Sequence, residues 1–242
     1  MKRNFRGINL AFCVNTSSQM AFCFSAMMES IRRFHSALEQ DLTLRAVSQL
    51  SVVGYDCSIH LLHPFSPISS DLILPDTPAP WEGQLYLRGL YECLTQFAAA
   101  HCDSSPDGTA LNILILLTNS VFRGIPGSHP ALQAIVPSSI LRQEQQGRLV
   151  FLPLGIDSPE GVPVLNELSG APKRFLLPIA CSELDEFFDK LRRFLSTFLT
   201  YAPGKAPNAE IFSQFLPGHP LSYPPAPPLD FDSVVLGWDE VC

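Results

Sequence analysis

The sequence predicts a doubly wound, Rossmann-like α/β fold, with a mostly parallel central sheet, one antiparallel edge strand and helices on both faces. Three observations predict this fold. Several short runs are almost continuously apolar, which is typical of strands buried on both faces. Segments with apolar residues at helical spacing lie between most of these runs, so helices should join parallel strands. Two of the runs are separated by too few residues for such a crossover, so this pair should be antiparallel.

The first strands come early in the chain. Residues 8–14 (INLAFCV) are predicted to form a buried strand that ends at a polar Asn-Thr-Ser-Ser loop. Residues 49–56 (QLSVVGYD) and 58–65 (SIHLLHPF) are predicted to pair as a hairpin. A loop rich in Pro, Ser and Asp follows at 66–81.

Two helices are predicted from long apolar faces. The first runs from Met20 to near Glu39, with Ser17 or Ser18 as its N-cap. The last begins at Ser182 with a capping-box-like Ser-Glu-Leu-Asp and should dock its apolar face on the sheet. The predicted faces are Met20, Phe24, Met27, Ile31, Phe34 and Leu38 in the first helix, and Leu184, Phe187, Phe188, Leu191, Phe194, Leu195 and Phe198 in the last.

The middle of the chain continues the alternation of strands and helices. Because the strands are mostly parallel, a ligand or partner site should lie at their carboxyl ends, where the strand order reverses. The predicted elements are a helix at 87–98, a strand at 111–118, a helix at 131–146, a strand at 148–155, a short helix at 162–169 and a strand at 174–177.

A change of composition divides the chain into a domain at 1–201 and a tail at 202–242. Eight of the 22 prolines fall between Pro203 and Pro228, which is typical of an extended, semi-rigid segment. The end of the tail mixes acidic with apolar residues, a composition suited to docking in a groove of a partner. Packing of the tail on its own domain is an equally supported alternative. The candidate docking residues are Phe231, Val235, Leu236 and Trp238.

Composition argues against several classes of function. The chain has 16 Lys and Arg against 23 Asp and Glu, a net charge of −7, which disfavours nucleic acid or an anionic membrane as the main partner. Its longest apolar runs are far shorter than the roughly 20 residues that cross a bilayer. The N-terminus lacks the cleavage pattern of a signal peptide, so we expect an unprocessed, cytoplasmic protein.

The seven cysteines predict no metal or catalytic site. They are odd in number, lie mostly in apolar segments and form no C-x-x-C pair, so we interpret them as reduced core residues. A zinc site would need clustered Cys and His ligands, and the nearest candidates, His60 with His63 and His101 with Cys102, lack a matching second half. Cys13 lies within a predicted buried strand, which does not favour a catalytic Cys–His pair.

Segments spread along the chain follow the order of a known domain. Residues 8–20 (INLAFCVNTSSQM) match a strand followed by Asp-x-Ser-x-Ser, and residues 52–56 (VVGYD) match an apolar strand that ends in Phe-Asp. Residues 115–120 (ILLTNS) match Leu-Leu-Thr-Asp-Gly, and residues 150–155 followed by 165–170 match a closing strand and short helix. In these features the chain resembles the von Willebrand factor A (vWA) domain, most closely the TerY-like bacterial branch. The resemblance is stronger in order and spacing than in exact residues.

The resemblance also implies a metal-ion-dependent adhesion site, and this site is degenerate here. Domains of this kind hold a divalent cation through two Asp, two Ser and a Thr; the corresponding residues here are Asn15, Ser17, Gln19, Gln84 and Asn119. Because Mg²⁺ favours carboxylate oxygen and both Asp are replaced by Asn, we expect no functional metal. A weak Mg²⁺ site completed by a carboxylate of the partner is the alternative. Hydrogen bonds among these side chains would account for their polarity, yet neutral amides can also bind a protein surface.

We therefore expect a non-catalytic protein interaction module. The resemblance implies a TerY-like adaptor that acts with a kinase or phosphatase in a stress-response or defence system, and a scaffold subunit of a larger intracellular complex is the alternative. An enzyme with Ser17 or Ser18 as nucleophile is disfavoured because no Gly-x-Ser-x-Gly elbow is present. Nucleotide-binding glycine motifs are also missing. Asp56 is interpreted as a loop cap rather than a ligand, and Asp157 as a solvated loop acid.

Overall fold

The computed structural model describes residues 7–56, 58–77, 92–96, 110–118, 140, 142–143, 149–157 and 178–201. In this part of the chain the strands are β1 (Gly7–Asn15), β2 (Ser48–Tyr55), β3 (Ile59–Pro67), β4 (Ala110–Thr118), β5 (Leu149–Ile156) and β6 (Pro178–Ile179). The helices are α1 (Phe24–Gln40), α2 (Leu42–Val47) and α7 (Leu184–Tyr201), with short 3₁₀ turns η1 (Ser18–Met20) and η3 (Cys181–Glu183).

The described strands form one six-stranded sheet in the order β3-β2-β1-β4-β5-β6. Every neighbouring pair is parallel except β2 with β3, which form the antiparallel hairpin at the edge. The order runs outward in both directions from β1, which is the arrangement of a doubly wound sheet. The structure thus confirms the predicted α/β class, the mostly parallel sheet and the antiparallel edge strand.

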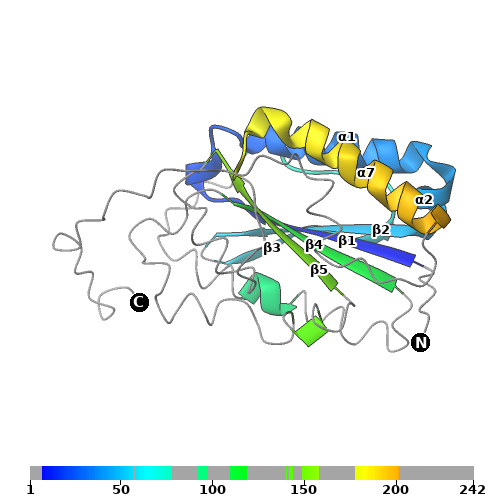
Figure 1. The fold of residues 1–242 in the computed structure, drawn as a ribbon. Coiled ribbons are helices and arrows are strands. Elements are labelled where there is room, and N and C mark those ends of the chain that lie inside the picture. The colour runs from blue at the N-terminus through cyan, green and yellow to red at the C-terminus, as the bar shows by residue number, and fades with distance from the viewer. Residues whose placement is uncertain are drawn as a thin grey trace, which may run out of the picture.

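Helices α1, α2 and α7 lie together on one face of the sheet, and the short helical segment 92–96 lies on the opposite face (Figure 1). Side chains of a strand alternate between the two faces, so a central strand covered on both sides must be apolar throughout. This explains why β4 and β5 are buried along almost their whole length. The sequence runs LNILILLT and LVFLPLGI meet that requirement without any regular polar alternation.

The predicted apolar faces of the first and last helices are buried, as expected. Three aromatic rings join the two helices to the sheet: Phe12 of β1 contacts Phe34 of α1 and Phe188 of α7, with ring centroids 6.0 Å and 5.6 Å away. Phe34 and Phe188 stack on each other at 5.1 Å. Such aromatic pairs add to the hydrophobic stabilisation from burial alone. The prediction that the last helix docks on the sheet is confirmed.

The predicted start of the first helix is wrong. The chain leaves β1 through η1, in which the Met20 N–H donates to the Ser17 carbonyl oxygen at 2.9 Å, and α1 begins only at Phe24. Neither Ser17 nor Ser18 caps it, because Cys23 occupies the N-cap position and makes no side-chain cap. Met20 is buried nonetheless, although it lies in η1 and not in α1.

Two further local features differ from expectation. Helix α2 is absent from the predicted elements; Asp41 begins it by accepting hydrogen bonds from the backbone N–H groups of Thr43 and Leu44, each at 3.1 Å. At the start of the last helix, the Glu183 carboxylate accepts from the Ala180 N–H at 3.2 Å, so the cap lies two residues before the expected Ser182. A polar side chain at a turn can start a helix even where the sequence has no long apolar repeat. Analysis of hydrophobic periodicity cannot detect such a helix start.

Several predicted elements lie wholly or partly outside the described residues. Of the predicted helices at 87–98 and 131–146, residues 92–96, 140 and 142–143 are described, and they are helical. The predicted helix at 162–169 and strand at 174–177 fall outside them, as does the tail, while β6 follows directly at Pro178. None of the described helices has the length and apolar character needed to span a bilayer.

Candidate functional site

Strands β1, β2, β4 and β5 run in the same direction, so their carboxyl ends meet at one edge of the sheet. Asn15 of β1 lies beside Tyr55 of β2, and Thr118 of β4 lies beside Gly155 of β5. In open α/β sheets this edge is where ligands and partners bind. We call residues 15–22, 55–56 and 58–60 at this edge the rim.

The Asn15 side chain is hydrogen-bonded to the backbone of the loop that begins at this residue. Its side chain is fully buried, and its Oδ1 accepts a hydrogen bond from the Ser17 N–H at 2.9 Å. The Thr16 N–H donates to the Tyr55 carbonyl oxygen at 2.8 Å, which ties the loop to β2. A short amide readily bonds the backbone two residues further on, and this turn needs such an acceptor. Asn15 therefore fixes the backbone conformation of this part of the rim.

Two buried hydroxyls lie next to this turn. Within the described residues, Thr16 Oγ1 and Ser17 Oγ are inaccessible to solvent and have no hydrogen-bond partner. Leaving a buried polar group unsatisfied costs about 1–3 kcal/mol. These two hydroxyl groups of the rim can therefore form hydrogen bonds for which the described residues supply no partner.

The predicted site residues are only partly placed. The structure brings Asn15 and Ser17 together, and Gln19 follows in η1. The remaining ones lie outside the described residues: Gln84, Asn119, Phe231, Val235, Leu236 and Trp238.

The described part of the rim does not fit a resident Mg²⁺ ion. Asn15, Thr16 and Ser17 offer neutral oxygens, and Mg²⁺ demands octahedral geometry with carboxylate ligands. The carboxylate of the described rim is Asp56, and both of its oxygens accept hydrogen bonds within its own hairpin. Nowhere in the described ranges do three His, Cys, Asp or Glu side chains gather so that they could hold a metal ion. No step of the function proposed below depends on a metal.

Asp56 holds the turn between β2 and β3. Its Oδ1 accepts from the Ser58 N–H at 2.8 Å and from the Ser58 hydroxyl at 3.1 Å, and its Oδ2 lies 3.0 Å from His60 Nε2. Burial acts to raise the pKa of Asp56, but the hydrogen bonds from Ser58 and His60 outweigh it, so the pKa lies below its ordinary value. These bonds support the interpretation of Asp56 as a loop cap.

The same three residues do not form a hydrolytic triad. The Ser58 hydroxyl lies 3.2 Å from His60 Nε2, the same ring nitrogen that contacts Asp56. A triad needs the acid on one imidazole nitrogen and the nucleophile on the other, so that the proton of the nucleophile has an acceptor. The geometry suits a fixed turn rather than acyl transfer.

Asp157 closes the edge beyond β5. It adopts φ of 47°, in the left-handed region, and its carboxylate oxygens accept from the Cys181 N–H at 3.2 and 3.3 Å. Asp tolerates this conformation better than most residues. The residue is exposed, as predicted for a loop acid, but it also holds the first residue of η3, the turn that precedes α7.

Burial raises the pKa of Cys23 to about 12 and also raises that of neighbouring Cys181, so neither thiol is a ready nucleophile.

Phe22 is a rim residue that sequence analysis missed. It lies on the turn between η1 and α1 with 64% of its surface exposed. The sequence signal is weak: Phe22 falls outside the predicted apolar face of the helix, and the turn that follows η1 exposes it. A large aromatic side chain that is exposed beside a strand-end loop is a typical anchor for a protein partner.

Comparison with known proteins defines the fold of the chain. No protein family model matches the sequence, and no curated protein sequence matches it. Among solved structures, the von Willebrand factor domain of the type V pilus tip protein Mfa5 from Porphyromonas gingivalis aligns with a TM-score of 0.54 and 12% identity, over 81% of this chain and 97% of that domain. The pilus adhesin SpaC from Lactobacillus rhamnosus GG aligns with a TM-score of 0.53 and 11% identity, over 80% of this chain and 30% of the adhesin.

Proximal thread matrix protein 1 from the mussel byssus aligns with a TM-score of 0.50 and 15% identity, over 78% of this chain. The chain spans about half, 48%, of the length of that mussel protein. The class that these structures define is the vWA fold, a doubly wound sheet covered by helices. The expected vWA architecture is therefore confirmed at the level of the fold.

Proposed function

We propose that this chain is a non-catalytic protein interaction module that binds its partner through the rim, without a resident divalent cation. The observation that carries the proposal is Phe22, which stands exposed on the loop leaving the central strand at the binding edge of the sheet. A buried aromatic anchor supplies much of the affinity in protein interfaces. Phe22 would bury most of its ring on contact with a partner.

The polar part of the rim supports the same proposal. Ser18 is exposed on η1, four residues before Phe22, and His60 is partly exposed on the neighbouring hairpin. Neutral hydroxyls and amides beside an aromatic anchor match the mixed polar and apolar character of protein interfaces. Solved structures with this fold include a pilus adhesin and a pilus tip protein, which favours a binding role over a catalytic one.

For the partner, we propose a protein of a signalling pair, a kinase or a phosphatase, in a stress-response or defence system. This follows from the resemblance of the chain to the TerY-like branch. On this proposal residues 1–201 are the binding domain, Gln84 and Asn119 extend the rim, and residues 202–242 are a docking tail. A scaffold role in a larger intracellular complex would use the same rim, so the identity of the partner distinguishes the two.

Affinity purification tests the proposal. The tagged full-length chain is recovered from cells that express it natively, and proteins retained in stoichiometric amounts are identified by mass spectrometry. Phe22→Ala should reduce recovery of the partner at least tenfold, since an interface anchor contributes about 2 kcal/mol or more. Leu42→Ala is the matched control, because Leu42 is equally apolar and 79% exposed but lies beyond the far end of α1.

Three further experiments test the roles of the rim amides, of the tail and of a metal ion one at a time. Gln84→Ala with Asn119→Ala should weaken binding with little change in the melting temperature, and a large loss of stability would make these residues structural. A chain ending at residue 202 should fold but lose the partner if the tail docks in trans. Washing with a chelator should leave the complex intact; release of the partner by the chelator would favour the weak Mg²⁺ site. Equal recovery with Phe22→Ala and Leu42→Ala would exclude the rim as the binding surface.

A further inference from the structure

Two buried cysteines from distant parts of the chain meet beneath the sheet. The Sγ atoms of Cys13 in β1 and Cys93 in the helical segment 92–96 are 2.7 Å apart, although 80 residues separate them in sequence. Each residue is only 2% exposed. Nothing in the function proposed above uses this pair.

The position of Cys13 follows from the alternation of β1. Phe12 points to the face covered by α1 and α7, where it contacts Phe34 and Phe188. The next residue must point to the opposite face, and the segment 92–96 lies there (Figure 1). Because β1 is hydrogen-bonded to β2 on one side and β4 on the other, the Cys13 side chain has little freedom to move away. The contact is therefore built into the central strand.

The distance between the two sulfur atoms points to one kind of chemistry. It is only about 0.7 Å longer than the ~2.05 Å of a covalent S–S bond. Two thiols alone do not make a metal site, and no third His, Cys, Asp or Glu ligand joins them among the described residues. Burial and the neighbouring Cys93 thiol raise the pKa of Cys13 well above its ordinary value, so it is not poised as a catalytic thiolate.

We propose that Cys13 and Cys93 are an oxidisable pair that forms a reversible intramolecular disulfide, with a peroxide as the oxidant. Hydrogen peroxide converts one thiol to a sulfenic acid and releases one water molecule. The second thiol then attacks that sulfur; the S–O bond breaks, the S–S bond forms, and a second water molecule leaves. In total the two thiols give two protons and two electrons to one peroxide molecule, which becomes two molecules of water. A dithiol reductant reverses the step by thiol–disulfide exchange.

The disulfide would fasten the segment 92–96 to the central strand. A cross-link that closes a loop of this length restricts the unfolded chain strongly, so the oxidised protein should unfold at a higher temperature. Because both thiols are buried, the reaction requires a transient opening of the segment and should be slower than oxidation of an exposed cysteine.

The test is a peptide map of the full-length chain under non-reducing conditions. The reduced protein is treated with hydrogen peroxide, remaining thiols are alkylated in denaturant, and the chain is digested with chymotrypsin. Cleavage after Phe22 and Phe97 separates Cys13 and Cys93 from their nearest cysteine neighbours in sequence. We expect a linked peptide pair lighter by two hydrogen atoms, which disappears after treatment with dithiothreitol.

Two variants complete the test. Cys13→Ala should abolish the linked pair and leave Cys93 alkylated, whereas Cys23→Ala is the matched control and should retain it. The map of the unmodified protein decides the proposal even if Cys13→Ala does not fold. Full alkylation of Cys13 and Cys93 after peroxide treatment, or a Cys13 linked mainly to another cysteine, would overturn it.

Discussion

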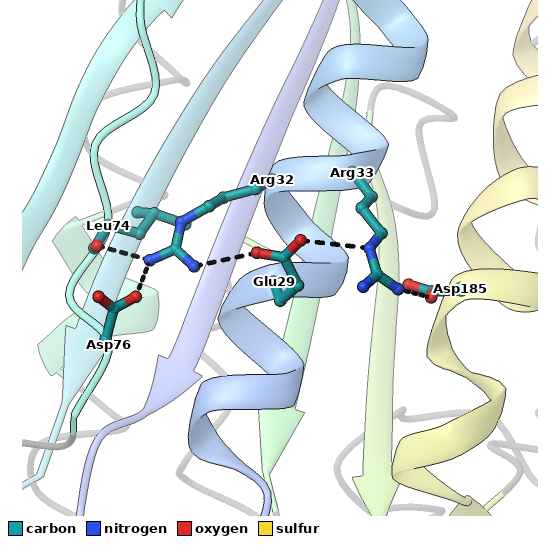
Figure 2. Close-up of polar contacts among 6 residues, drawn as sticks. All are labelled: Glu29, Arg32, Arg33, Leu74, Asp76 and Asp185. Atoms are coloured by element: carbon teal, nitrogen blue, oxygen red, sulfur yellow. Dashed lines mark hydrogen bonds and ion pairs between the residues drawn. The ribbon is translucent and has the colours of Figure 1, made fainter.

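The Nη2 of Arg32 on α1 lies 2.7 Å from the carbonyl oxygen of Leu74, in the segment that follows the β2–β3 hairpin. The same nitrogen lies 2.5 Å from Asp76 Oδ1, so one guanidinium holds this segment against the helix (Figure 2). The next residue, Arg33, points the other way and pairs with Asp185 of α7 (Figure 2). Two successive arginines therefore tie α1 to two different neighbours.

These arginines should differ in their contribution to stability. Arg32→Ala should destabilise the protein by about 1–3 kcal/mol, because it leaves the carbonyl of the buried Leu74 without this donor. Arg33→Ala is the matched substitution one position along, and its effect should be small and should shrink as salt is added, since its ion pair is exposed. Urea unfolding at low and high salt measures both. Equal losses in the free energy of unfolding would show that the Arg32–Leu74 hydrogen bond stabilises the protein no more than the exposed Arg33–Asp185 ion pair does.

Gly54 of β2 is required by a close approach to the rim. A Cβ atom at this position would lie 2.5 Å from Thr16 Cγ2, which is too short for two carbon atoms, and 3.3 Å from Leu62 Cδ1. Gly54→Ala should therefore cost about 1–3 kcal/mol by overpacking. At Gly7 of β1 the nearest atom would be 3.5 Å away, an ordinary contact, so Gly7→Ala should be neutral or slightly stabilising. Thermal unfolding of the two variants distinguishes them, and a neutral Gly54→Ala would contradict the geometry.

Phe188 should be among the most sensitive positions of the core. Its ring contacts Phe12, Phe34 and Phe187, and it is almost completely buried. Phe188→Ala should cost about 3–5 kcal/mol, the usual range for a buried aromatic residue. Phe22→Ala removes the same atoms from an exposed position and should leave the free energy of unfolding nearly unchanged. Guanidinium unfolding of both variants is the measurement, and comparable losses would mean that Phe22 is also part of the core.

Two buried histidines predict loss of stability in mild acid. Burial lowers the pKa of His35 although Glu39, Asp71 and the Ser70 carbonyl oppose the shift, and burial together with His35 lowers the pKa of His63. Both rings thus bind protons less readily in the folded than in the unfolded chain. Their stabilising contribution is complete above the unfolded pKa of about 6.5 and is lost progressively as the pH falls below it.

Melting temperatures measured between pH 8 and pH 5 check this sign. The melting temperature should fall as the pH drops below about 6.5, and His35→Gln should fall less steeply than the unmodified protein. A melting temperature that rises on acidification would show that the folded chain, not the unfolded one, binds the extra protons.

Periodicity and apolar runs in the sequence are sufficient to predict the architecture. Residues 8–14 are apolar except for Asn9 because β1 is covered on both faces, and the spacing of Phe34 and Phe188 within their helices assigns both residues to the core. The short gap at residue 57 is sufficient to predict the antiparallel hairpin. These features depend on the local geometry of helices and strands, which the order of residues carries directly.

The rim is less predictable, because its atoms are placed by contacts between loops. The sequence correctly places Asn15 at a strand end, but the bond from the Ser17 N–H to its side chain depends on how the loop turns. The exposure of Phe22 follows from η1, a short turn without an apolar period of its own. The cap at Asp41 is not predicted for the same reason.

The sequence alone determined the fold class and the apolar faces of α1 and α7, and it predicts the edge of the sheet at which a partner should bind. Only the tertiary structure decided which atoms meet across the chain, such as the sulfurs of Cys13 and Cys93 and the bond from Arg32 to Leu74. The physical reason is range: side-chain periodicity repeats every two to four residues, whereas these contacts join segments far apart in sequence and exist only once the layers have packed.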